Sequence, residues 1–325
     1  LPARAREWRM LRLERAAQAA LREALAESYA GRYGRAHKAA QRAIAIQDDR
    51  DDVGDDHEFR TLAHLLAAGS LPRLQDRARR DEVLHRALRP GRRGANQAVD
   101  DGARLLAAEW AIDDRDAQRS LQLLGDLPPG VVRRTQALRL KLQATRLGQQ
   151  PQEALKTARL LVKHQGLSKA ASQGLLRSLA FECLDTAHDI DQLRRTWQSL
   201  DAVDRRDNFV AARAALRAAQ LGAPDEGRNW LRPGWERIED TTDDERAALS
   251  FALVCAIAGI GADWLPRLES AQLAFPREAA VAHAVGTALA ERQLWGKARL
   301  LLEAAIASPV DRLTQTEKTL RTVAR

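Results

Sequence analysis

Glu291-Arg-Gln-Leu-Trp-Gly-Lys-Ala-Arg-Leu-Leu-Leu-Glu-Ala-Ala-Ile306 is the stretch of sequence that decides the fold. It has the pattern of the turn and second helix of a helical hairpin. Small residues at Gly286, Ala298 and Ala305 mark where two helices touch, because only Gly or Ala lets two backbones approach that closely. Trp295 is expected to plug the corner of this hairpin.

The spacing of these small residues recurs upstream. Within each triplet the residues are separated by 12 and then by 7 positions. The clear copies are Ala24, Ala36 and Ala43, and Ala252, Trp264 and Ala271. Looser copies are Ala68/Arg80/Ala87, Leu105/Ala117/Leu124, Leu142/Ala154/Leu161, Ala180/Gln192/Ser199 and Ala215/Gly227/Gly234. The first members of successive triplets lie 34 to 44 residues apart, which is typical of tetratricopeptide-type repeats.

We therefore predict an all-α chain that forms a right-handed superhelical solenoid of about eight tetratricopeptide-like helical hairpins. The chain, 1–325, is expected to be a single solenoid, with irregular repeats over 1–130, regular repeats over 131–310 and a capping helix over 311–325. The irregular part contains two interruptions, acidic Asp48–His57 and basic Arg89–Gly94. An unrelated helical bundle is the alternative fold.

The composition favours an anionic partner. The 325 residues include 52 Lys or Arg and 44 Asp or Glu, for a net charge of +8. Acidic proteins or lipid headgroups suit this charge, whereas no basic run is interleaved with aromatic residues, so no nucleic-acid partner is expected. Cys183 and Cys255 stand in apolar helical contexts and are expected to be buried. The longest apolar run, 247–262, is shorter than the about 20 residues that a spanning helix needs.

Motifs for catalysis or metal binding do not occur in the sequence. There is no G-x-G-x-x-G, no H-x-x-x-H and no C-x-x-C. We therefore expect that the chain is not an enzyme, holds no metal and requires no cofactor. Five tryptophans recur at the predicted repeat corners and are expected to fill the core: Trp197, Trp230, Trp235, Trp264 and Trp295.

Two segments carry a more specific signal, Ala187-His-Asp-Ile-Asp-Gln-Leu-Arg-Arg-Thr-Trp197 and Glu291-Arg-Gln-Leu-Trp-Gly-Lys-Ala298. Supporting segments are Ala170–Leu176, Asn229–Trp235 and Asp263–Glu269. Through these segments the C-terminal half of the chain resembles the HemY family of proteobacterial tetratricopeptide-repeat proteins. The N-terminal half fits through Gly31–Tyr33, Leu62–Ala68 and Arg79–Leu84, so the resemblance covers nearly the whole chain. The resemblance implies an inner-membrane protein with two N-terminal spanning helices and a large repeat region, associated with the later steps of haem biosynthesis.

The function that the resemblance implies is a membrane-tethered, non-catalytic scaffold for other proteins, chiefly haem-biosynthesis enzymes. It places this region on the cytoplasmic side of the bacterial inner membrane, soluble by itself, with the spanning helices before Leu1. The opening segment agrees, because a basic stretch after a spanning helix indicates the cytoplasmic side and suits contact with an anionic membrane surface. Its arginines alternate with apolar residues: Arg4, Arg6, Arg9, Arg12 and Arg15 with Trp8, Met10, Leu11 and Leu13. An ordinary solvated helix face is the alternative.

Two other functions stay open at this point. A protein that binds or carries haem or porphyrin non-covalently needs only one or two axial ligands. The candidates are His188, next to Asp189 that would orient its imidazole, and His64, which stands among leucines. For each, a structural histidine satisfied by its neighbours is the alternative. The other function is a general envelope-assembly adaptor unrelated to haem.

Overall fold

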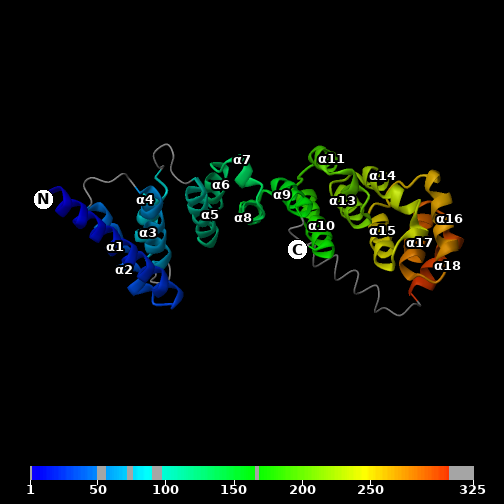
Figure 1. Cartoon of the computed structure of the whole chain (residues 1–325). Helices are drawn as coiled ribbons and strands as arrows, with labels where there is room; N and C mark the ends of the chain where they lie inside the picture. Colours follow the sequence, from blue (N-terminus) through cyan, green and yellow to red (C-terminus); the bar gives the residue numbers. More distant parts are fainter. Residues whose placement is uncertain (1, 50–55, 72–75, 90–96, 165–167, 307–325) are drawn as a thin grey trace. The chain divides into compact units, whose positions relative to one another are not determined.

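The computed structural model describes residues 2–49, 56–71, 76–89, 97–164 and 168–306. Every regular element in these ranges is a helix, which confirms the all-α fold class. The chain divides into two compact units, Leu1–Gln150 and Pro151–Arg325, whose helices are shown in Figure 1. A single solenoid that continues through both units stays a prediction. The predicted capping helix over 311–325, residues 50–55 of the acidic interruption and residues 90–94 of the basic one lie outside the described residues.

The first unit consists of consecutive helices that pack on their neighbours in the chain. Asp56, Asp76 and Asp116 begin three of them, because each carboxylate accepts a hydrogen bond from the backbone N–H three residues later. The helices are α1 (Pro2–Tyr29), α2 (Tyr33–Asp48), α3 (His57–Ser70), α4 (Arg77–Ala87), α5 (Gln97–Asp113), α6 (Ala117–Gly125), α7 (Pro129–Val132) and α8 (Thr135–Leu147).

The second unit has a more regular order. Its α-helices are α9 (Pro151–Lys163), α10 (Lys169–Asp185), α11 (Ile190–Ser199), α12 (Ala202–Arg205), α13 (Asn208–Gln220), α14 (Pro224–Trp235), α15 (Asp243–Cys255), α16 (Leu265–Ala274), α17 (Ala279–Glu291) and α18 (Trp295–Ile306). Short 3₁₀ turns, η2 (Ile238–Asp240) and η3 (Ala262–Trp264), precede α15 and α16. Helix α10 packs on α13, α13 on α15 and α15 on α17, so these four helices form a row, which Figure 1 shows.

Helices in the second unit approach one another most closely at small residues. A Cβ added to Gly227 of α14 would lie 2.9 Å from the carbonyl oxygen of Ala215 in α13. A Cβ added to Gly286 of α17 would lie 2.9 Å from Cγ of Leu302 in α18. A Cβ at either distance would overlap its neighbour, so a larger residue at position 227 or 286 would push the two helices apart.

The predicted packing residues are buried, with one exception. Ala24, Ala36 and Ala43 in the first unit, and Ala252, Trp264, Ala271, Gly286, Ala298 and Ala305 in the second, are all buried. Trp295 is 65 % exposed, so its prediction as a plug of the core is wrong. It lies at the first position of α18, which packs on α17, and the described residues provide no further helix that would cover it.

The other tryptophans of the second unit lie in or against the core. Trp235 and Trp264 are each 2 % exposed and meet edge to face, with ring centroids 6.2 Å apart. Trp197 is buried and stacks on Trp230, which is half-buried, with centroids 5.0 Å apart. Such aromatic pairs stabilise a core beyond the area that they bury.

None of the helices in the described ranges combines the length and the hydrophobicity that a membrane crossing requires. The apolar run over 247–262 contributes to α15 and to η3.

Candidate functional site

His188, one of the two candidate haem ligands, lies between α10 and α11 with an exposed side chain. Its backbone N–H donates to the side-chain oxygen of Gln192 at 2.9 Å. The carboxylate of Asp189 accepts from the backbone N–H of Gln192 at 2.7 Å and caps α11. Asp189 therefore holds the start of a helix, and the structure gives it no role in orienting the imidazole.

His64, the other candidate, is buried on α3 in the first unit. Its Nδ1 lies 2.7 Å from the carbonyl oxygen of Arg60, one turn earlier in the same helix, so Nδ1 carries the proton and donates. Burial lowers the pKa of His64, which keeps the imidazole neutral. This is the environment of a structural histidine, and a haem iron would have to displace packed side chains to reach it.

Two histidines that the sequence analysis did not single out join helices in the first unit. Nδ1 of His37 on α2 donates to the carbonyl oxygen of Ala67 on α3 at 3.0 Å. Nε2 of His57 on α3 lies 2.6 Å from Oδ1 of Asp100 on α5. Groups of three or more His, Cys, Asp or Glu that could hold a metal ion are absent from the part of the chain that the structure describes.

The two cysteines differ in exposure. Cys183 on α10 is buried, as expected, and burial raises the pKa of its thiol to about 12. Cys255 is exposed at the last position of α15, so the prediction that it is buried is wrong. The buried side of the last turn of α15 is formed by Ala252 and Leu253, and Cys255 lies on the other side of the helix.

Arginine side chains connect successive helix pairs in the second unit. Arg213 and Arg217 on α13 reach back to the end of α10, where Arg213 Nη2 binds Asp185 Oδ2 at 2.6 Å and Arg217 Nη2 donates to the carbonyl oxygen of Ala187 at 2.6 Å. Because both partners lie 28 to 30 residues earlier in the chain, these contacts tie α13 to the preceding helix pair. We call such contacts inter-pair arginine ties.

Further ties of the same kind follow along the unit. Arg228 on α14 donates to the carbonyl oxygen of Ala258, after α15, at 2.7 Å, and it is 4 % exposed. Arg292, after α17, donates to the carbonyl oxygen of Ile260 at 3.2 Å. Both arginines thus donate to backbone carbonyls in the turn between α15 and η3.

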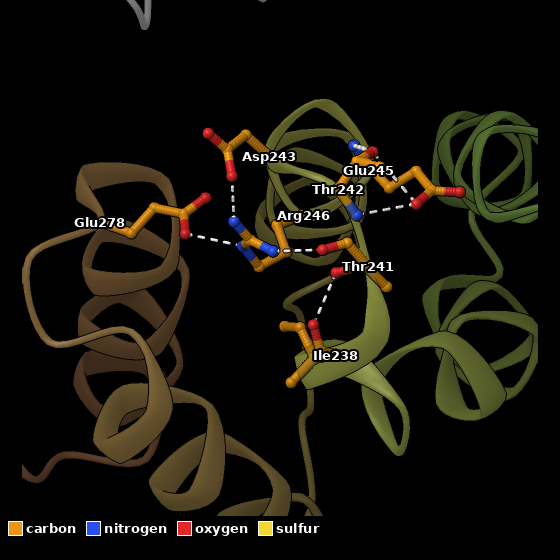
Figure 2. A network of polar contacts seen from close by, with 7 residues as sticks. All are labelled: Ile238, Thr241, Thr242, Asp243, Glu245, Arg246 and Glu278. Carbon is orange, nitrogen blue, oxygen red and sulfur yellow. Dashed lines mark hydrogen bonds and ion pairs between the residues drawn. The ribbon is translucent and has the colours of Figure 1, made fainter.

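Arg246 on α15 makes the most extensive of these ties, shown in Figure 2. Its Nε donates to Oε2 of Glu278, just before α17, at 2.7 Å, and its other nitrogens bind the carbonyl oxygen of Thr241 and the carboxylate of Asp243. The guanidinium carbon also lies 4.0 Å from the centroid of the Phe275 ring. The arginine is 7 % exposed, so its charge is almost entirely taken up within the fold.

Arginine ties also occur in the first unit. Arg80 on α4 binds Asp81 and, beyond α5, Asp114. The hydrogen bond from Arg80 holds the pKa of Asp114 below its usual value. The paired arginines and carboxylates cancel one another, so the net charge of +8 comes from basic residues outside these ion pairs.

A shallow polar depression of about 440 Å³ lies on the second unit. It is lined by Gln152, Thr186, Ala187, Gln192, Arg195, Thr196 and Ser199. Arg195 is exposed and is the one charged residue of this lining. The lining offers a cation and several hydrogen-bonding groups, which suit a peptide carboxylate or another polar group of a partner, but it brings no acid–base pair together.

Comparison with known proteins gives no assignment. The chain matches no model of a protein family, and a search of curated proteins finds no relative. The described residues therefore define an all-helical protein with a polar depression on its surface and arginine ties between its helices.

Proposed function

We propose that this protein is a non-catalytic scaffold for protein–protein interaction, built as a right-handed superhelical solenoid of about eight tetratricopeptide-like hairpins. The observation that carries the proposal is the row of α10, α13, α15 and α17, each packed on the next. Stacking of the first helix of each pair on the first helix of the next pair is how repeat proteins bury their core.

The inter-pair arginine ties support the same proposal. Arg217, Arg228 and Arg292 each donate to a backbone carbonyl 30 to 32 residues away, which is close to one repeat. The predicted triplets also fall on successive helices: in the first unit on α1/α2, α3/α4 and α5/α6, and in the second on α10/α11, α13/α14, α15 with η3 and α16, and α17/α18. The remaining triplet has its first member on α8 and the other two on α9. An arrangement of this kind presents extended surface, and extended surface suits a partner protein better than a small substrate.

The resemblance to the HemY family supplies the biological setting of the proposal. In this setting the full-length protein is tethered to the bacterial inner membrane, the region described here lies on the cytoplasmic side, and the partners are haem-biosynthesis enzymes. The depression around Arg195 suits contact with such a partner, because it combines an exposed cation with hydrogen-bonding side chains.

Site-specific photo-crosslinking in the intact membrane form tests the proposal. In one variant a photoreactive residue replaces Arg195 in the depression. In a second variant, the matched control, it replaces Glu303, which is exposed on α18. We expect enzymes of tetrapyrrole synthesis to be captured from position 195 and not from position 303. Capture of unrelated envelope proteins alone would favour the general adaptor, and equal capture from both positions would contradict a docking surface around Arg195.

Non-covalent haem or porphyrin binding is the second candidate function. The observation that favours it is the exposed imidazole of His188, for which the described residues provide no side-chain partner, so its nitrogens are accessible to iron. His64 is a poor candidate by comparison, because it is buried and donates from Nδ1 to Arg60. A spectral titration with haemin separates this candidate from the scaffold.

A further inference from the structure

Helix α1 presents a continuous exposed face that no described element covers. The residues of this face recur at intervals of three and four, so they lie on one side of the helix. They are Arg4, Trp8, Leu11, Arg12, Arg15, Ala19, Arg22, Ala26 and Tyr29, and all of them are exposed. At about 1.5 Å per residue the face extends over about 38 Å. We call it the α1 outer face.

The opposite side of α1 accounts for its contacts within the protein. Ala17, Ala20 and Ala24 are buried there, against α2 and α3. The outer face contributes nothing to that core, yet it carries large apolar side chains: Trp8 is 64 %, Leu11 49 % and Tyr29 87 % exposed. Exposed side chains of this size in one row indicate a contact surface.

The charges of the α1 outer face are mainly positive. Four arginines lie on it, and the exposed acidic residues Glu7, Glu14 and Glu23 lie along its edges. Glu23 and Glu27 bind Arg42 and Arg32. In contrast, Arg4, Arg12, Arg15 and Arg22 have no carboxylate within ion-pair distance in the part of the chain that the structure describes, and the guanidinium of Arg12 lies 5.6 Å from the centroid of the Trp8 ring.

We propose that the α1 outer face lies on an anionic lipid membrane, with Trp8, Leu11 and Tyr29 in the headgroup region and the arginines on lipid phosphates. A helix that combines an apolar row with arginines lies in the plane of an interface, because the apolar side chains enter it while the long arginine stems extend to the charged headgroups. Trp and Tyr are the aromatic residues that favour this depth of a membrane.

The arrangement suits a membrane better than other anionic partners. Single-stranded nucleic acid would require aromatic rings at the spacing of successive bases, whereas Trp8 and Tyr29 lie near opposite ends of the face. A partner helix would require a continuous apolar seam, but Arg15 and Arg22 interrupt the row at seven-residue spacing from Trp8. This surface is separate from the depression around Arg195, so the present inference does not depend on the proposed scaffold function.

Co-sedimentation of the 325-residue chain with vesicles tests the inference. Vesicles of phosphatidylcholine with phosphatidylglycerol should bind the protein at low salt, and vesicles of phosphatidylcholine alone should not. Replacing three arginines together (Arg4→Gln, Arg12→Gln and Arg15→Gln) should weaken binding about 100-fold, because each basic side chain near an anionic surface contributes to the partition constant. High salt should weaken binding of the original protein in the same way.

A matched variant controls for net charge. Arg133, Arg205 and Arg277 are also exposed and lie elsewhere in the chain, and their joint replacement by Gln removes the same charge. This variant should bind within a few-fold of the original chain, whereas an equal loss in both variants would show non-specific attraction and overturn the inference. A further variant, Trp8→Ser with Leu11→Ser, keeps every arginine and should lose most of the binding and the blue shift of tryptophan emission.

The absence of binding to anionic vesicles at low salt would also overturn the inference. If the α1 outer face joins two copies of this chain instead, sedimentation velocity without vesicles will show a dimer that the Trp8→Ser and Leu11→Ser variant converts to a monomer. That result, too, would overturn the assignment to lipid.

Discussion

Replacing Arg246 by Ala is the sharpest test of the inter-pair arginine ties. The side chain is 8 % exposed and joins α15 to the N-terminal end of α17 through Glu278 (Figure 2). It also donates to the carbonyl oxygen of Thr241 and lies over the ring of Phe275. Its loss therefore removes contacts both to the segment before α15 and to the turn between α16 and α17.

The size of the effect follows from these contacts. Without the guanidinium, the Thr241 carbonyl and the carboxylate of Glu278, which is 23 % exposed, lose their donor. Each such charge-assisted bond is worth about 1.5 kcal/mol, and the contact with Phe275 adds about 0.5–1 kcal/mol. Asp243 is 83 % exposed, so its ion pair contributes little. We expect the free energy of unfolding to fall by about 3.5 kcal/mol.

Urea unfolding followed by circular dichroism and tryptophan emission measures this change. Trp235 and Trp264 lie in the core of the same unit and report on it. Arg299→Ala is the matched control, because that side chain is 81 % exposed and its pair with Glu303 should be worth less than about 0.5 kcal/mol. A loss for Arg246→Ala below about 1 kcal/mol, or equal to that of the control, would refute the reasoning.

Three further predictions address single residues. Maleimide should label Cys255 in the native protein and Cys183 only after unfolding, as read by mass spectrometry, and equal labelling of both in the native protein would contradict the burial of Cys183. Because the folded pKa of Cys183, about 12, exceeds the unfolded value, its contribution to stability should disappear as the pH rises from about 9 to 12. Gly227→Ala should lower the free energy of unfolding by about 2 kcal/mol, because the new Cβ lies 2.9 Å from a backbone oxygen. Gly174→Ala on α10, where a Cβ meets nothing within 4 Å, should raise it by about 0.5–1 kcal/mol, and thermal unfolding that ranks the two variants the other way would contradict the reasoning. If the protein binds haem, His188→Ala should abolish the Soret shift on haemin titration, and a shift that survives the substitution would exclude His188 as the ligand.

Some close contacts between helices could be predicted from the sequence, because only a small residue fits where two backbones nearly touch. Gly227 stands 12 positions after Ala215, and the structure places the two backbones so close that a Cβ at position 227 would lie 2.9 Å from the Ala215 carbonyl. A contact of this kind requires a small residue wherever it occurs, so small residues recur at a regular spacing that can be recognised in the sequence alone. The same reasoning gave Ala24 and Ala36, which are both fully buried.

The errors have a different origin, since they concern what covers a side chain. Trp295 has the residue type of a core plug, but burial depends on whether another helix packs over α18. Cys255 belongs to an apolar run, yet the last turn of α15 directs it outward. The arginine ties could not be predicted from single residues either, because an arginine that is paired 30 residues away looks in the sequence like one that is free. The separation of about one repeat between Arg217 and Ala187 is the signal that could have shown them.

The distinction between paired and unpaired arginines decides how the net charge of +8 should be interpreted. Arg228 and Arg246 are buried and bonded, so salt has little access to them and their effect is on stability. Arg12 and Arg15 on the α1 outer face are exposed and have no carboxylate partner among the described residues, so their attraction to an anion falls steeply with ionic strength. Salt should therefore release the protein from vesicles at concentrations that leave its unfolding midpoint almost unchanged. If both transitions moved together with salt, the arginines would not divide into a structural set and a binding set.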